Sequence, residues 1–127
     1  MILLLPSCTS IRNYKKSDFY VKKDEYLRAH KIAFICGCIN EGTNNSLNKF
    51  MIENKDVSLF SEAELISHYR VKEADSIGRI YFKKINPINY EDAGYGKAIF
   101  SNCIYYAYSK EVDKIARMSY KQIRKSK

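Results

Sequence analysis

The sequence predicts an all-α protein, folded as a compact bundle of four to five helices. Apolar residues recur at spacings of three and four in several segments, which is the pattern of a helix with one buried face. Serines stand just ahead of two of these segments, where they are favoured as helix caps. No segment alternates apolar and polar residues as a half-buried strand would, so no strand is predicted.

The composition fits a single globular domain. The chain has 127 residues, of which 46% are hydrophobic and 28% charged. Its apolar runs are far shorter than the roughly 20 residues that span a bilayer. The formal net charge of +8 is typical of proteins that bind nucleic acid or an anionic membrane surface, so both are considered as partners. Residues 110–127 hold seven basic and two acidic residues, so most of the excess positive charge lies in this one segment. The segment has no DNA-binding signature, and we therefore do not expect nucleic acid as a partner.

The N-terminal segment, residues 1–17, is distinct from the helical domain predicted over residues 18–127. Its beginning, "MILLLPSC", resembles the end of an export signal, and Leu5-Pro6-Ser7-Cys8 resembles a bacterial lipoprotein processing site. On one interpretation translation starts further upstream, and Cys8 is the lipidated first residue of a periplasmic lipoprotein, anchored in the membrane. On the other, this is a disordered, apolar N-terminus. Residues 9–17 are polar and basic and are typical of a tether.

The first predicted helix runs from about Asp18 to Ile39. Its expected inward face consists of Leu27, Phe34, Ile35, Cys38 and Ile39. The turn-forming run "NEGTNNS", residues 40–46, ends this helix, and a short helix is predicted over about residues 47–54.

A long helix is predicted next, over about residues 62–84. Ser61 and Glu64 form a capping box at its start, because the serine can accept from a free backbone N–H and the glutamate can reach back. Gly78 lies inside the pattern, at a cost of about 1 kcal/mol relative to alanine. A close crossing of two helices would explain this glycine.

The clearest loop is "NPINYEDAGYG", residues 86–96, in which a proline and two glycines disfavour a helix. The helix after it carries an apolar stripe made of Ile99, Phe100, Cys103, Ile104 and Ala107. Ser109 is a good N-cap for the last helix. That helix has an apolar face of Val112, Ile115, Ala116 and Ile123, opposite a basic face of Lys114, Arg117, Lys121 and Arg124.

No residues of the sequence form a recognisable catalytic, metal or cofactor site. A thiol hydrolase needs a histidine close to its cysteine. His30 and His68 lack any recognisable flanking signature, and we expect each to be exposed or hydrogen-bonded. Cys36 and Cys38 form C-x-C rather than C-x-x-C, without a second pair that would complete a zinc site. We therefore expect a protein that is not an enzyme and binds no metal or cofactor.

The chain contains 11 tyrosines and no tryptophan. We expect the tyrosines of the predicted helices, such as Tyr105, Tyr106 and Tyr108, to flank the core. Tyr90 and Tyr95, in the long loop, are better candidates for a protein interface. Tyrosine is favoured there because it buries a large area at low entropic cost and keeps a polar tip.

The segment "SNCIYYAYSKEVDKIAR", residues 101–117, resembles the C-terminal signature of the amidase immunity proteins of type VI secretion. In that family a helix bears a cysteine and an aliphatic residue, then an aromatic residue and Ser-Lys-Glu-aliphatic-Asp. The matching residues are Cys103, Ile104, Tyr108, Ser109, Lys110, Glu111, Val112 and Asp113. Upstream, "ICGCIN" resembles the first-helix cysteine of the family, which Cys38 and Ile39 match best. The helix order over about residues 24–122 is similar as well.

The resemblance implies a small helical periplasmic protein, often a homodimer, that neutralises a peptidoglycan amidase. The amidase is a papain-like enzyme with a cysteine nucleophile, delivered by rival or sister cells, and the immunity protein covers its cleft. The resemblance also implies an interhelical disulfide between Cys38 and Cys103, with Cys36 as the alternative partner. Such a bridge would contribute about 4 kcal/mol. Buried free cysteines are the alternative in a reducing cytosol, and the bridge is expected in a periplasm.

We expect the amidase to contact the loop over residues 86–97, chiefly through Tyr90, Glu91, Asp92 and Tyr95. A protruding loop with aromatic and acidic side chains could enter an enzyme cleft. A second interpretation is a small envelope lipoprotein with a structural or binding role and no toxin partner. An amidase-like reading frame beside this gene would favour the immunity function, and its absence would favour the second interpretation.

Overall fold

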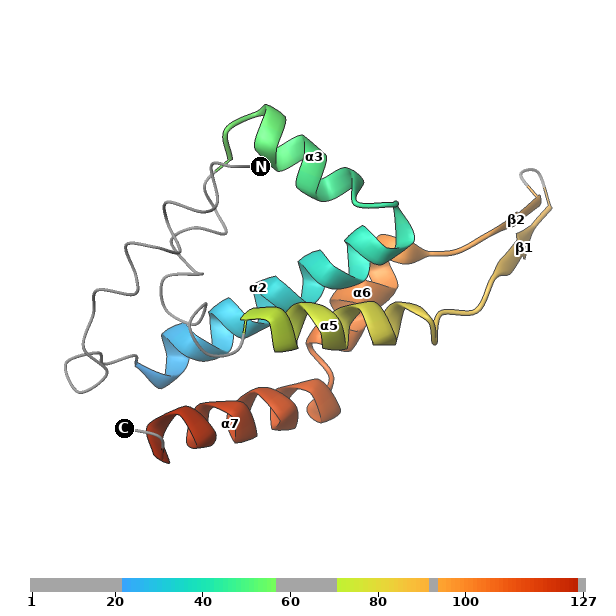
Figure 1. The fold of residues 1–127 in the computed structure, drawn as a ribbon. Coiled ribbons are helices and arrows are strands. Elements are labelled where there is room, and N and C mark those ends of the chain that lie inside the picture. The colour runs from blue at the N-terminus through green and yellow to red at the C-terminus, as the bar shows by residue number, and fades with distance from the viewer. Residues whose placement is uncertain (1–21, 57–70, 92–93, 126–127) are drawn as a thin grey trace.

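The computed structural model describes residues 22–56, 71–91 and 94–125, and these residues form a helical bundle with one projecting hairpin (Figure 1). The elements in order are α2 (Lys23–Gly42), α3 (Ser46–Glu53), α5 (Val71–Phe82), β1 (Ile88–Tyr90), β2 (Gly94–Gly96), α6 (Ile99–Ala107) and α7 (Lys110–Lys125). The all-α prediction is confirmed. Cys8, the boundary at residue 17 and the capping box of Ser61 and Glu64 lie outside the described residues.

Helices α2 and α5 make the closest contact of the bundle, through glycines on both helices. A Cβ added at Gly37 would overlap the carbonyl oxygen of Asp75, and one added at Gly78 would overlap the carbonyl oxygen of Phe34. Only glycine lets two helix backbones approach this closely. The close crossing predicted from Gly78 is therefore confirmed, and it explains why the helix tolerates a residue of low helix propensity.

The buried face of α2 differs in part from the predicted one. Phe34 and Cys38 are fully buried as predicted, but Leu27, Ile35 and Ile39 are only half-buried. The other buried positions of the helix are Tyr26, Ala29, His30, Ala33, Gly37 and Asn40. The prediction ranked residues by hydrophobicity, whereas backbone-to-backbone packing against α5 requires small side chains at the contact. The large aliphatic residues accordingly lie beside it.

The core extends along α2 in three groups. The first group contains Tyr26, Ala29, Ala33, Ala74, Tyr120 and Ile123, the second Phe34, Tyr81, Ala107 and Val112, and the third Cys38, Ile85 and Cys103. A buried hydrogen bond lies in the first group, between the hydroxyl groups of Tyr26 and Ser119, which are 2.6 Å apart. This hydrogen bond links α2 to α7 across most of the chain.

The junction between α6 and α7 is fixed by Ser109. The backbone N–H of Val112 donates to the Ser109 hydroxyl oxygen at 3.2 Å, which confirms the predicted N-cap. The same hydroxyl donates to the carbonyl oxygen of Tyr106 at 2.7 Å, so one side chain joins the last turn of α6 to the first turn of α7. One turn further, Arg117 donates to the carboxylate of Asp113 at 2.7 Å.

The turn between α2 and α3 is held by polar side chains. Arg79 of α5 donates to Asp75 at 2.8 Å, to Glu41 at 3.2 Å and to the side-chain oxygen of Asn45 at 3.2 Å. Asn44 and Asn45 adopt positive φ angles of 54° and 63°, which asparagine tolerates better than most residues. The run "NEGTNNS" ends the helix as predicted, three residues later than expected.

Candidate functional site

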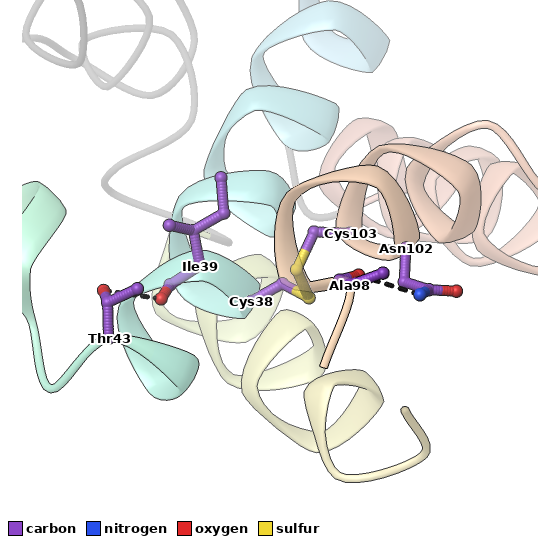
Figure 2. Close-up of a disulfide and its surroundings, with 6 residues drawn as sticks. All are labelled: Cys38, Ile39, Thr43, Ala98, Asn102 and Cys103. Atoms are coloured by element: carbon purple, nitrogen blue, oxygen red, sulfur yellow. Dashed lines mark hydrogen bonds between the residues drawn. A yellow bond between two sulfur atoms is a disulfide. The ribbon is translucent and has the colours of Figure 1, made fainter. Parts of the chain in front are cut away.

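A disulfide bond joins Cys38 of α2 to Cys103 of α6 (Figure 2). Their Cα atoms lie 5.7 Å apart, and 65 positions of chain separate them. Both cysteines are fully buried and pack with Ile85, next to the half-buried Phe82 and Tyr106. The pairing implied by the family resemblance is confirmed. In the loop-entropy model, closing a loop of this length contributes about 4 kcal/mol to the free energy of unfolding.

Cys36, the alternative partner, remains a free thiol. It lies two residues before Cys38, which is about 200° around the helix, so the two side chains leave α2 on different sides. Burial raises the pKa of the Cys36 thiol to about 11, and the negative charges of Asp75 and Asp56 add to this effect. Cys36 is therefore protonated at neutral pH, a state that is unreactive as a nucleophile.

Side-chain hydrogen bonds lie directly beside both halves of the bridge (Figure 2). The Thr43 hydroxyl donates to the carbonyl oxygen of Ile39 at 2.8 Å, and so satisfies one of the last carbonyls of α2. The side-chain amide of Asn102 donates to the carbonyl oxygen of Ala98 at 2.8 Å, at the start of α6. The bridge thus joins the last turns of α2 to the middle of α6, and these two hydrogen bonds hold the end of α2 and the start of α6.

The predicted loop contains a β-hairpin that the sequence pattern does not predict. Ile88 pairs with Gly96, Asn89 with Tyr95 and Tyr90 with Gly94, in antiparallel register. Gly94 has a φ angle of +75°, a backbone conformation that residues other than glycine rarely adopt. The expectation of no strand is wrong here because three-residue strands are too short to show alternation. Figure 1 shows the hairpin projecting away from the helices.

The hairpin holds the residues predicted to contact a partner. Tyr95 is 79% exposed, and Glu91 at the turn is exposed as well. Tyr90 is the last residue of β1, and Asp92 lies outside the described residues. The structure therefore places Tyr90, Glu91 and Tyr95 in one projecting element and leaves Tyr95 open to a partner.

Three aromatic side chains on or next to α6 are exposed, including Phe100, which was wrongly predicted to belong to the apolar stripe of this helix. Phe100, Tyr105 and Tyr108 are 69%, 71% and 69% exposed. The expectation that the helical tyrosines flank the core holds for the half-buried Tyr106 but is wrong for Tyr105 and Tyr108. The ammonium group of Lys31 lies 4.1 Å from the centre of the Tyr108 ring, a cation–π contact with α2. At helical spacing, both tyrosines lie on the side of α6 away from Cys103, a signal present in the sequence.

His30 is buried rather than exposed or hydrogen-bonded, so that expectation is wrong. Neither of its ring nitrogens has a hydrogen-bond partner among the described residues. Burial lowers the pKa of His30, while the negative charge of Glu73 acts in the opposite direction. A fully buried ring is out of reach of a substrate. His68 lies outside the described residues.

Within residues 22–56, 71–91 and 94–125, no three histidine, cysteine or acidic side chains are grouped as metal ligands would be. None of the helices in these ranges is long and apolar enough to cross a bilayer.

Comparisons of the chain with family models, with curated proteins and with solved structures find no match. The class that the described residues define is a small disulfide-bridged helical protein with an exposed hairpin.

Proposed function

We propose that the protein is a periplasmic immunity protein that binds a type VI-secreted peptidoglycan amidase and blocks its active-site cleft. The observation that carries the proposal is the bridge between Cys38 and Cys103, the two positions that the family resemblance pairs. Structural disulfides persist in oxidising compartments and are rare in the cytosol, which supports the periplasmic location.

The C-terminal signature has a structural role in this chain, which adds support. Cys103 forms the bridge, Ser109 caps α7, and Val112 is buried beneath the cap. Asp113 pairs with Arg117 in the first turns of α7. A signature of this kind preserves a scaffold. The choice of partner then depends on exposed surface residues.

The hairpin is the part of that surface best suited to enter a cleft. Backbone hydrogen bonds between β1 and β2 hold its strands together, so a partner that binds it orders little additional chain. Tyr95 supplies a large exposed ring and Glu91 a negative charge. An inhibitor that acts by occlusion needs no catalytic group of its own. Homodimer formation and anchoring through Cys8 belong to the same proposal.

The test is co-purification with a candidate amidase, followed by an assay of cell-wall cleavage with and without this protein. The decisive variant carries alanine at Tyr90, Glu91, Asp92 and Tyr95. A matched control carries alanine at four exposed α3 residues, Lys49, Phe50, Ile52 and Glu53. We expect the hairpin variant to lose affinity by about a hundredfold or more, because buried aromatic anchors dominate interfaces, while the control keeps it.

Three results separate the parts of this proposal. If the hairpin variant binds as well as the unchanged protein, the hairpin is not the contact. If the unchanged protein binds no amidase encoded beside it, the immunity function is wrong and the envelope lipoprotein remains. Mass spectrometry of the mature N-terminus and the mass of the native protein in solution test lipidation of Cys8 and homodimer formation.

A further inference from the structure

The outward side of α7 forms a surface that the proposed function does not use. Successive helical residues are about 100° apart, which brings six basic residues within an arc of about 100°. All six side chains are exposed. This basic face consists of Lys110, Lys114, Arg117, Lys121, Arg124 and Lys125.

The basic face carries no acidic residue within its arc. Glu111 and Asp113 lie at its two edges, and the carboxylate of Asp113 accepts a hydrogen bond from Arg117. Four lysines remain along the centre of the face. On the opposite side of α7, Val112 and Ala116 are buried against the bundle. One side of α7 is therefore positively charged and exposed, and the opposite side is apolar and buried.

The position of α7 leaves this face accessible. Figure 1 shows α7 at the edge of the described bundle, with its other side against the remaining helices. Its long axis lies along the surface, so the lysines form a row more than two helical turns long from Lys114 to Lys125. Such a row can contact a flat surface at several points at once.

Met118 is the one apolar side chain on this surface. It is 52% exposed. Around the helix it lies at the edge of the basic face, between Lys125 and Glu111. A methionine among cations is suited to the headgroup region of a bilayer. There its apolar end can reach the glycerol and upper acyl layer, while lysines extend to the phosphates.

We propose that the basic face of α7 docks on the surface of an anionic phospholipid bilayer. Clusters of four to eight basic residues on an amphipathic helix bind anionic lipids, and each adds affinity while it lies within a Debye length of the surface. The apolar side of α7 packs in the bundle, so binding is electrostatic and peripheral. This inference goes beyond the proposed inhibition and does not depend on it.

Nucleic acid is the competing anionic partner, and the composition of the face favours lipid. Bases are read chiefly by arginine in a bidentate geometry, whereas four of the six cations here are lysines. Of the two arginines, Arg117 is paired with Asp113, and the guanidinium group of Arg124 lies 5.9 Å from the centre of the Tyr120 ring. Tyr120, the aromatic residue of α7, is buried, so the face offers no ring for base stacking.

The experiment is sedimentation of the full chain with vesicles of phosphatidylglycerol and phosphatidylcholine, and with vesicles of phosphatidylcholine alone. The face variant is Lys114→Gln, Lys121→Gln and Lys125→Gln. The matched control, Lys49→Gln, Lys55→Gln and Lys83→Gln, removes the same charge at exposed positions outside α7. Circular dichroism and thermal unfolding show whether both variants fold as the unchanged chain does.

We expect binding to the anionic vesicles only, weakening as salt is added, and lowered on the order of a hundredfold by the face variant. We expect the control to bind as the unchanged chain does, and Met118→Ser to weaken vesicle binding without affecting any binding to duplex DNA. Equal losses in the face variant and the control would overturn the proposal in favour of general charge attraction. Tighter binding to duplex DNA than to vesicles at the same salt would overturn it in favour of nucleic acid.

Discussion

Gly78 of α5 lies so close to Phe34 of α2 that a Cβ on the glycine would overlap the carbonyl oxygen of Phe34. Gly37 makes the reciprocal contact with the backbone of α5 at Asp75. Cys38 follows Gly37 directly, so the disulfide is attached to α2 at the point where the two helices touch. The crossing and the bridge therefore fix the same part of the bundle, one by contact and the other by a covalent bond.

Replacing Gly78 with alanine should lower the free energy of unfolding by about 1–3 kcal/mol, the usual cost of overpacking. Intrinsic helix propensity alone predicts the opposite sign, because alanine in a helix is about 1 kcal/mol better than glycine. Unfolding in guanidinium chloride measures the change. Ser76→Ala, at an exposed position of the same helix, is the control. A Gly78→Ala protein more stable than the unchanged chain would contradict the close crossing.

Loss of the bridge should lower the free energy of unfolding by about 4 kcal/mol in the double variant Cys38→Ala and Cys103→Ala. Cys36→Ser is the matched control, because this thiol is free. Peptide mapping with and without reductant should recover residues 38 and 103 as one linked pair. Recovery of Cys36 in that pair would show that the oxidised protein has a different connectivity.

Acid should destabilise the fold through His30. Its pKa in the folded state lies below the ordinary value of 6.5, because burial opposes the charged form. The unfolded chain then binds a proton that the folded chain excludes, so stability is full above pH 6.5 and falls as the pH drops below it. Denaturant unfolding across this range should show a shallower pH dependence in His30→Leu. An identical slope in both proteins would mean that His30 is not the group responsible.

Removal of the cap in Ser109→Ala should cost about 1 kcal/mol, the typical value for an N-cap hydroxyl. The variant loses the bond that Val112 donates and the one that Ser109 donates to Tyr106. Thermal unfolding checks the loss against Ser101→Ala, an exposed serine of α6. Equal unfolding temperatures in the two variants would show that the cap contributes nothing.

The helices could largely be predicted from the sequence, because their signals are local. The capping serine at residue 109 and the apolar spacing from Ile99 to Ala107 place α6 and α7 within a residue or two of their observed bounds. The face that α2 buries could not be predicted in full. It depends on how closely α5 approaches, a tertiary property that hydrophobicity does not encode. Hydrophobicity therefore favours Leu27 and Ile35 over the alanines that are in fact buried, Ala29 and Ala33.

The candidate site was predicted unevenly for the same reason. Tyr95 could be singled out because proline and glycine mark the segment around it as a loop, but the pairing of β1 with β2 has no signal over three residues. The choice of Cys38 over Cys36 depended on the family resemblance. Spacing alone cannot show which of the two cysteines pairs with Cys103. The answer depends on which side of α2 faces α6, and the sequence does not give that.

The bridge also makes the protein a closed ring between residues 38 and 103, and this ring includes α3, α5 and the hairpin. A protease that cut the exposed hairpin would break one peptide bond without releasing a fragment. The two pieces would travel together on a gel until a reductant was added. In a molecule cut at the hairpin, both strands would therefore remain attached to the same disulfide-bridged bundle.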